Sequence, residues 1–215
     1  MTFFNRIAAM PLVAILRGLE PDEAVEIGES LVEAGFRCLE VPLNSPEPYE
    51  SIRRLKAALG DQALIGAGTV LDVHAVSHVK DSGGELIISP NAYRAVIDAA
   101  TAHGMVSIPA FFTPTEAFAA IAAGAHGLKL FPAEGSSPAM LKAMRAVLPK
   151  DMPIFVVGGV TPDNMAPWLA AGANGFGIGS SLYKPGVSAR EVATHARSFV
   201  SAWKRLTASK AHPAQ

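Results

Sequence analysis

The stretch His126-Gly127-Leu128-Lys129-Leu130-Phe131-Pro132 is typical of a buried β-strand that carries one cationic side chain. Successive side chains of a strand point to opposite faces, so Leu128 and Leu130 share one face and Lys129 points to the other. If both faces are covered, the amine lies in a poorly hydrated place, and the loss of hydration lowers its pKa. A neutral lysine can attack a carbonyl carbon and form a Schiff base. The alternative is a lysine near a strand end that snorkels to water.

Similar apolar strands recur along the chain, and each is followed by a helical pattern. The predicted strands are Leu12–Leu16, Cys38–Leu43, Ala63–Ala67, Leu86–Ser89, Met105–Pro109, Gly127–Phe131, Ile154–Val157 and Gly175–Ile178. The predicted helices lie near residues 21–34, 46–59, 72–82, 91–103, 114–123, 138–148, 162–171 and 188–206. A strand and a helix every 20–30 residues or so predict an α/β fold, a small (β/α)₈ TIM barrel. The rival is a doubly wound open sheet.

The barrel is expected to form a single domain over residues 1–206, followed by a flexible tail at 207–215. A short helix near residues 3–9 is expected to cover the bottom of the barrel. No stretch rich in serine and glycine and no break in composition indicates a second domain.

Composition excludes several classes of partner. Of the 215 residues, 50% are hydrophobic and 17% are charged, which is typical of a compact globular protein. A net charge of -1 supplies no basic surface for nucleic acid or for acidic lipid. A single cysteine, Cys38, rules out an internal disulfide and a cysteine-based metal site. The first residues lack the long apolar core of a signal peptide, so none is expected, and no stretch approaches about 20 uninterrupted apolar residues. We therefore expect a soluble, cytoplasmic protein that binds neither nucleic acid nor membrane.

In both candidate folds, functional groups gather beyond the carboxyl ends of the strands. The polar and glycine residues at those positions are Arg17, Glu40, Asn44, Thr69, Asn91, Lys129, Gly158, Gly159, Gly179 and Ser180. This clustering is the main functional signal in the chain.

Glu40 is expected to face the barrel axis with Cys38, while Leu39 and Val41 face the helices. A buried carboxylate needs a partner, so Glu40 is either a general acid/base close to Lys129 or half of a structural ion pair. Arg17 ends the first strand, and its planar guanidinium suits a carboxylate or phosphate, or a salt bridge on the surface.

Thr69 is the last residue of Gly66-Ala67-Gly68-Thr69, in which the small residues would let a ligand approach the backbone and Thr69 offers a hydroxyl. The alternative is a tight turn between strand and helix. Gly158-Gly159 and Gly179-Ser180 follow the last two strands, where barrels often hold phosphate on backbone N–H groups. The alternative is glycine for turn geometry.

No metal and no cofactor is expected. His74 and His78 are spaced like metal-binding histidines on a helix, but no helical glutamate accompanies them in a known arrangement.

Six motifs in order, from about residue 11 to residue 205, resemble the 2-keto-3-deoxy-6-phosphogluconate/phosphogalactonate aldolases. They are Ala14-Ile15-Leu16-Arg17-Gly18, Leu39-Glu40-Val41-Pro42-Leu43-Asn44-Ser45-Pro46, Ile65-Gly66-Ala67-Gly68-Thr69-Val70, Ser89-Pro90, Gly127-Leu128-Lys129-Leu130-Phe131-Pro132 and Val157-Gly158-Gly159-Val160. The resemblance implies a class I aldolase on a TIM barrel, usually trimeric and without metal. By similarity, Lys129 matches the Schiff-base lysine and Glu40 the general acid/base.

The remaining site residues are assigned by the same resemblance. Arg17 and Thr69 are similar to the groups that hold the substrate carboxylate and the keto-acid end. The residues that match the phosphate-binding segments are Gly158, Gly159, Gly179 and Ser180.

Two positions indicate the galactonate branch of this family. Gluconate-type members typically carry Thr-Gly-Gly-Ile and an arginine three residues after the Glu-Val of the second strand. This chain has Val157 and Asn44 at those places. Valine cannot hydrogen-bond the C4 hydroxyl, and Arg17 would supply the cation that Asn44 cannot. The stretch Pro109-Ala110-Phe111-Phe112-Thr113 departs from the family, which usually has Pro-Gly and smaller residues there.

The resemblance therefore implies cleavage of 2-dehydro-3-deoxy-6-phospho-D-galactonate to pyruvate and D-glyceraldehyde 3-phosphate, by a homotrimer. The nearest alternative is a gluconate-type or broad-specificity 2-keto acid aldolase. Other classes are a non-catalytic sugar-phosphate-binding barrel and another phosphate-binding barrel enzyme, such as an isomerase or a thiamin-phosphate-type synthase. The synthase would need acidic metal or pyrophosphate ligands, and none is found at the strand ends.

Overall fold

The structure, a computed structural model, describes residues 6–211, and only the backbone of residues 209–211. In the described residues, eight parallel strands form a closed barrel in sequence order. The strands are β1 (Leu12–Ile15), β2 (Cys38–Pro42), β3 (Leu64–Gly68), β4 (Leu86–Ser89), β5 (Val106–Phe111), β6 (Leu128–Leu130), β7 (Ile154–Val157) and β8 (Gly175–Ile178). The last strand pairs with the first, Val13 opposite Gly177, which closes the barrel and excludes the open sheet.

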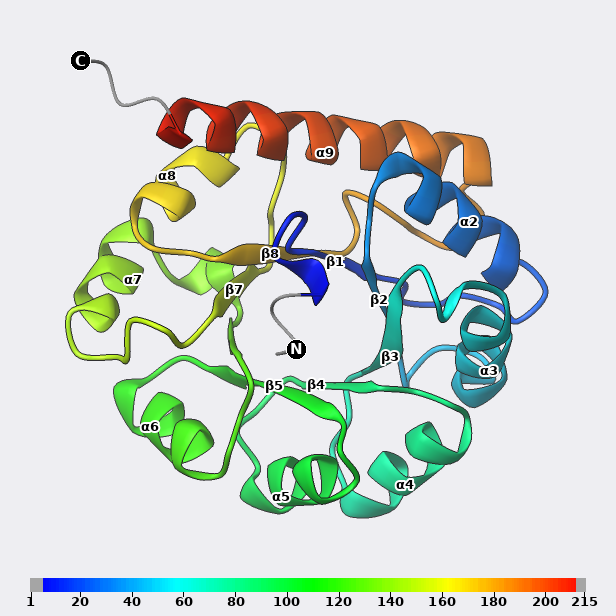
Figure 1. The fold of residues 1–215 in the computed structure, drawn as a ribbon, viewed down its shortest axis with the longest axis horizontal. Coiled ribbons are helices and arrows are strands. Elements are labelled where there is room, and N and C mark those ends of the chain that lie inside the picture. Colours follow the sequence, from blue (N-terminus) through cyan, green and yellow to red (C-terminus); the bar gives the residue numbers. More distant parts are fainter. Residues whose placement is uncertain (1–5, 212–215) are drawn as a thin grey trace.

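Helices surround the barrel on all sides (Figure 1). They are α2 (Ala24–Ala34), α3 (Pro48–Leu59), α4 (Val73–Asp81), α5 (Arg94–Ala102), α6 (Pro114–Ala122), α7 (Pro138–Arg145), α8 (Met165–Ala170) and α9 (Ala189–Ala211), with a short 3₁₀ helix, η1 (Ala133–Gly135). Capping interactions mark the starts of several of these helices. Thr113 and Glu116 form a capping box at the start of α6, and the Asp72 carboxylate accepts the N–H of Ala75 at the start of α4.

The predicted elements are confirmed, with differences at their ends. The fifth strand was expected at Met105–Pro109 but is Val106–Phe111, because its last residues pair with β6, Ala110 opposite Lys129. Helix starts differ from the expected ones by up to three residues. Segment 161–164 is an example. The N–H of Thr161 donates a hydrogen bond to Oδ1 of Asn164, which forms a turn, and α8 begins only after this turn.

Helix α9 continues to Ala211, beyond residue 206, where we expected the domain to end. No glycine or proline lies between residues 207 and 211 to stop it, and the first such residue is Pro213. Residues 212–215 of the expected tail lie outside the described residues. The same holds for residues 3–5 of the helix expected near residues 3–9, of which Arg6 and Ile7 are helical.

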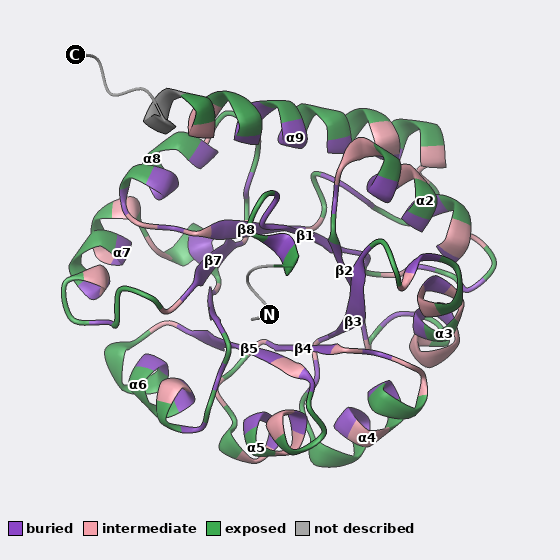
Figure 2. Cartoon of the chain, viewed as in Figure 1, coloured by how far each residue is buried: buried purple, intermediate pink, exposed green. Residues whose placement is uncertain are grey.

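The core has two layers on either side of the strands, and Figure 2 shows that the strands and the helix faces turned toward them are buried. The outer layer packs the strands against the helices and includes Leu128 and Leu130. The inner layer fills the lower barrel with a small apolar cluster: Ile7, Val13, Cys38, Leu64, Leu86, Ile88, Ile108 and Phe155. Ile7 closes the end of the barrel at which the strands begin. The interior is therefore blocked below and can admit a ligand only at the mouth, where the strands end.

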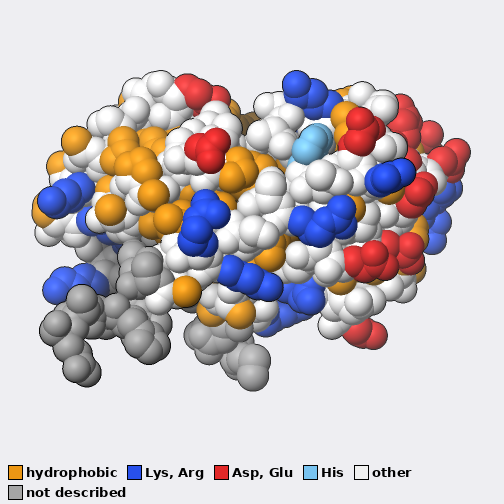
Figure 3. Space-filling view, turned by 90° about the horizontal axis from the view of Figure 1, so that it is seen from above, with side chains coloured by type: hydrophobic (Ala, Val, Ile, Leu, Met, Phe, Trp, Pro, Cys, Tyr) orange, Lys and Arg blue, Asp and Glu red, His pale blue; other side chains and the backbone are white. Residues whose placement is uncertain are grey.

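The surface offers no extended field of one charge on the face formed by α9 and α2, which carries both cationic and anionic side chains (Figure 3). Among the described residues, no helix combines the length and the apolar composition that a membrane crossing requires.

Candidate active site

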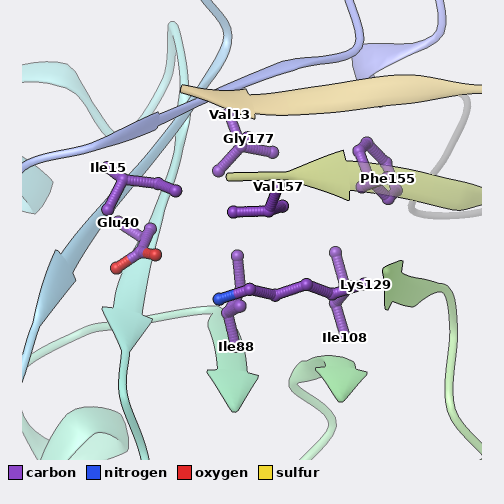
Figure 4. A pocket seen from close by; sticks show the side chains of 9 residues that line it. All are labelled: Val13, Ile15, Glu40, Ile88, Ile108, Lys129, Phe155, Val157 and Gly177. Carbon is purple, nitrogen blue, oxygen red and sulfur yellow. The ribbon is translucent and has the colours of Figure 1, made fainter. Parts of the chain in front are cut away.

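Lys129 and Glu40 both point into the barrel (Figure 4). They lie above the inner apolar cluster that fills the lower barrel, which is called the apolar plug below. Lys129 is the middle residue of β6 and is 7% exposed, and Glu40 is the middle residue of β2 and is 2% exposed. Their neighbours Leu128, Leu39 and Val41 lie in the outer core, so the alternation expected from the sequence is confirmed. Two ionisable groups thus share a water-poor interior.

The Glu40 carboxylate lies against the backbone of Gly68 at the end of β3. A Cβ atom on Gly68 would lie 1.7 Å from Oε2 of Glu40, so only glycine leaves room for this carboxylate. Oε2 has no hydrogen-bond partner among the residues that the structure describes. Burial raises the pKa of Glu40 to about 7, although the charges of Lys129 and Arg17 lower it. A carboxyl group with a pKa near 7 can both give and take a proton at neutral pH.

The Lys129 amine has its pKa lowered, chiefly because burial removes water from the charged form. The Glu40 charge acts in the opposite direction, and the Arg17 charge lowers the pKa further. In the described part of the chain, no ion pair of 4.0 Å or less joins Lys129 to a carboxylate. The amine lies 4.6 Å from the centroid of the Phe131 ring, a contact that favours a cation at this nitrogen.

A void of about 10 Å³ lies between these groups, lined by Glu40, Lys129, Val157 and the top of the inner core. That volume holds about one water molecule. Above it, a cavity of about 810 Å³ opens at the barrel mouth. Of the residues expected at the site, those that line this cavity are Arg17, Asn44, Lys129, Val157, Gly158, Gly159, Gly179 and Ser180.

Two residues predicted for the site are not among the residues that line this cavity, and their roles stay predictions. Thr69, which was expected at the keto-acid end, follows β3 with a left-handed backbone (φ 56°) and is not among the residues that line the cavity. Asn91 is not among them either. Glu40 reaches only the void below the cavity.

Arg17 and Asn44 form one unit at the mouth. The Arg17 Nη1 atom donates a hydrogen bond of 2.8 Å to Oδ1 of Asn44, and the N–H of Gly18 donates one of 2.9 Å to Oγ of Ser45. The loops after β1 and β2 are therefore tied together, and Asn44 orients the guanidinium rather than replacing it. Arg17 is exposed toward the cavity and can pair with an anion there.

The glycine loops after β7 and β8 expose backbone donors. Gly158 and Gly159 have left-handed φ values of 118° and 59°, which glycine adopts without strain. The described loop hydrogen bonds use the carbonyls of Gly159 and Gly179 but not the N–H groups of Gly159 or Ser180. Unpaired N–H groups beside small residues are typical of an anion site.

Sequence reasoning missed several residues of the site. Gly68 was expected to let a ligand approach, with a tight turn as the alternative, but it makes room for Glu40. Phe131 supplies the ring beside the amine. Lys184 and Tyr183 line the mouth cavity, and the Tyr183 hydroxyl donates a hydrogen bond to the Glu23 carboxylate. The short distance in sequence from Ser180 was the only signal that pointed to Lys184.

The stretch Ala110-Phe111-Phe112, which departs from the family pattern, lies outside the lining of the mouth cavity. Phe111 is buried in the outer core and Phe112 packs at its edge. Neither these two residues nor Ala110 line the cavity.

No metal site emerges from the part of the chain that the structure describes, where no three histidine, cysteine or carboxylate side chains are grouped to hold an ion.

The family model for KDPG and KHG aldolases matches residues 4–196. A probable 2-dehydro-3-deoxy-6-phosphogalactonate aldolase of Rhizobium meliloti is 51% identical over 193 residues, which cover 90% of this chain and 91% of that protein. The 2-dehydro-3-deoxy-6-phosphogalactonate aldolase of Escherichia coli is 47% identical over 195 residues, 91% of this chain and 95% of that protein.

Two solved structures agree with these relatives. A native KDPGal structure has a TM-score of 0.91 and 46% identity, and covers 93% of this chain and 97% of that one. A cube-shaped protein cage, designed by fusing symmetric oligomeric domains, has a TM-score of 0.92 and 46% identity, with coverage of 94% and 75%. The fold, the site and these similarities together lead to one conclusion: the chain belongs to the KDPG and KHG aldolase family.

Proposed function

We propose that this chain cleaves 2-dehydro-3-deoxy-6-phospho-D-galactonate to pyruvate and D-glyceraldehyde 3-phosphate through a Schiff base on Lys129. The observation that carries the proposal is the buried pair of Lys129 and Glu40, whose pKa values are moved toward neutrality from opposite sides. The names of the two curated relatives support the substrate. Valine at position 157 and asparagine at position 44 support the same branch.

The chemistry begins when the neutral Lys129 amine attacks the C2 ketone and water leaves, which gives an iminium ion. The positive nitrogen then accepts the electron pair of the C3–C4 bond. Glu40 removes the proton of the C4 hydroxyl through one water, for which the void beside it has room. Glyceraldehyde 3-phosphate leaves, Glu40 returns the proton to C3 of the enamine, and hydrolysis releases pyruvate.

The two ends of the substrate are held at different parts of the mouth. Arg17, oriented by Asn44, binds the carboxylate. The N–H groups of Gly159 and Ser180, with Gly158 and Gly179, bind the phosphate. Anchoring both ends fixes the scissile bond beside Glu40, so binding energy from remote groups serves orientation.

The other functional classes fit the site less well. A binding barrel gains nothing from a buried carboxyl and a buried amine, because each is costly to bury. A thiamin-phosphate-type synthase needs acidic ligands, and the described residues hold no such cluster. Within the aldolases, a gluconate-type or broad-specificity enzyme would use the same chemistry and differ at Val157. We also propose a cytoplasmic location, which the single, buried thiol of Cys38 supports.

The Schiff base can be tested by trapping. Borohydride reduction of the protein with pyruvate should leave a covalent adduct on Lys129, detected by mass spectrometry. Lys129→Met, which keeps much of the side-chain volume, should abolish both the adduct and turnover, because no amine remains at C2. Lys142→Ala on the exposed face of α7 is the matched control and should trap normally. Trapping that persists in Lys129→Met would assign the nucleophile to another lysine.

The role of Glu40 predicts the pH dependence of kcat/KM, which reports the pKa values of the free enzyme. Below pH 7 the carboxyl is protonated and cannot take the C4 proton, so kcat/KM should rise as pH increases through about 7. Glu40→Gln should still trap pyruvate, but its kcat should fall by about 10²–10⁴-fold. Its pH profile should also lose the rising limb near pH 7. Stopped-time assays between pH 5 and 9 measure both. Undiminished cleavage in the variant, or a limb near pH 7 that survives in it, contradicts the assignment.

Epimer preference should depend on Val157. The wild-type protein should cleave the galactonate epimer with a higher kcat/KM than the gluconate epimer. Val157→Thr offers a hydroxyl without changing the shape, and one neutral hydrogen bond should raise the relative kcat/KM for the gluconate epimer by about 2- to 10-fold. Val157→Ala controls for space alone and should not reproduce the gain. Equal effects of the two variants would exclude a hydrogen-bonding origin.

We further propose a homotrimer. Large apolar side chains are exposed along one sector of the barrel wall, at the starts of α4 and α5 and on α6. This apolar wall comprises Leu71, Val73, Tyr93 and Phe118. The designed cage related to this chain was built from symmetric oligomeric domains, which supports a symmetric assembly.

Sedimentation equilibrium should give about three times the chain mass of 22.4 kDa. Tyr93→Asp should lower the mass toward that of one chain, because a buried charge in the contact is costly. Val147→Asp, exposed at 60% outside the apolar wall, should leave the trimer intact. A wild-type monomer at micromolar concentration would refute the proposal.

A further inference from the structure

The side chain of Glu134 lies on the two glycines proposed to hold the phosphate. Glu134 belongs to η1, five residues after Lys129, and lines the mouth cavity. A Cβ atom on Gly158 would lie 2.0 Å from Oε2 of Glu134, and one on Gly159 would lie 3.0 Å from its Cγ. The carboxylate therefore rests directly on the backbone of the Gly158–Gly159 loop.

Nothing in the described structure holds Glu134 in that place. Its side chain is exposed, and it takes part in none of the described hydrogen bonds or ion pairs. Other exposed carboxylates near helix starts are fixed, for example Glu116 by the N–H groups of Phe112 and Thr113. Glu134 is therefore free to leave the glycine loop when another group enters.

A carboxylate and a phosphate cannot share this loop. The loop attracts anions through N–H groups that no described hydrogen bond uses, and Glu134 is itself an anion. A phosphate dianion brought into contact with it is repelled, and the repulsion is larger where water is scarce. The negative charge of Glu134 thus opposes the ligand that the glycines favour.

We propose that Glu134 is a specificity-determining residue that competes with the substrate phosphate for the Gly158–Gly159 loop. The inference rests on the proposed function, in which that loop binds the phosphate. Substrate binding displaces the carboxylate, and its return after C3–C4 cleavage helps to expel the phosphorylated aldehyde. Pyruvate, which has no phosphate, is bound at the Lys129 end and does not meet Glu134.

The test compares Glu134→Gln, which keeps the size of the side chain and removes its charge, with wild-type protein. The variant should lower KM for the phosphorylated substrate by about 5- to 10-fold, and tighten competitive inhibition by inorganic phosphate similarly. Both gains should shrink at high salt, because salt screens exposed charges. The borohydride trapping rate with pyruvate alone should not change.

Asp163→Asn is the matched control. Asp163 is an exposed acid beside the mouth that does not line the cavity. Its substitution therefore makes the same change in net charge without altering the Gly158–Gly159 loop. Its KM for the phosphorylated substrate should stay near that of wild-type protein. An equal gain in both variants would replace the local contact by a general effect of charge and overturn the inference.

The outcomes separate this inference from the proposed function. Normal pyruvate trapping and cleavage with an unchanged or raised KM in Glu134→Gln overturn the role of Glu134 and leave the aldolase intact. Absence of trapping in wild-type protein overturns the aldolase. In that case the role of Glu134 can still be tested by measuring the binding of inorganic phosphate by calorimetry. Phosphate should bind more tightly to Glu134→Gln than to wild-type protein, and an unchanged affinity contradicts the competition.

Discussion

The burial of Glu40 against the Gly68 backbone, facing the Lys129 amine, is the constraint on which the site depends. Moving the pKa of a carboxyl group from 4.5 to about 7 corresponds to about 3 kcal/mol in favour of the neutral acid. The protein sustains this because the strands bury apolar side chains on both faces. The apolar plug also keeps bulk water from reaching the pair from below. Reactivity at the mouth is thus a product of packing lower in the barrel.

The residues proposed to react and those proposed to bind the substrate occupy different kinds of structure. Lys129 and Glu40 lie within strands, where hydrogen bonds on both sides hold their backbone in place. Arg17 and the glycine loops lie just beyond strand ends, where positive φ angles and side-chain hydrogen bonds shape the chain. Rigid strands suit atoms that must meet at bonding distance, and adjustable loops suit ions that must enter and leave.

The sequence predicted the part of the site that strand alternation governs. Lys129, Glu40 and Cys38 face inward as the period of two requires, and the eight apolar runs mark the strands. The sequence is less informative where loop dihedral angles decide, as at Thr69, whose backbone is left-handed. Glu134 and Lys184 reach the mouth only because β6 and β8 deliver their loops there, which no local pattern encodes. The end of β5 depended on its pairing with β6, a contact between distant segments.

The closure of the barrel between β8 and β1 has a consequence for biosynthesis. Arg17 follows β1, near the start of the chain, whereas Gly179 and Ser180 follow β8, near its end. The pairing of these two strands brings together the groups proposed to hold the two ends of the substrate. A nascent polypeptide that has left the ribosome only as far as Val157 already contains the proposed nucleophile, Lys129, and the proposed proton carrier, Glu40. It still lacks half of the anchor. The proposed site is therefore complete only once the last strand has been made and has paired with the first.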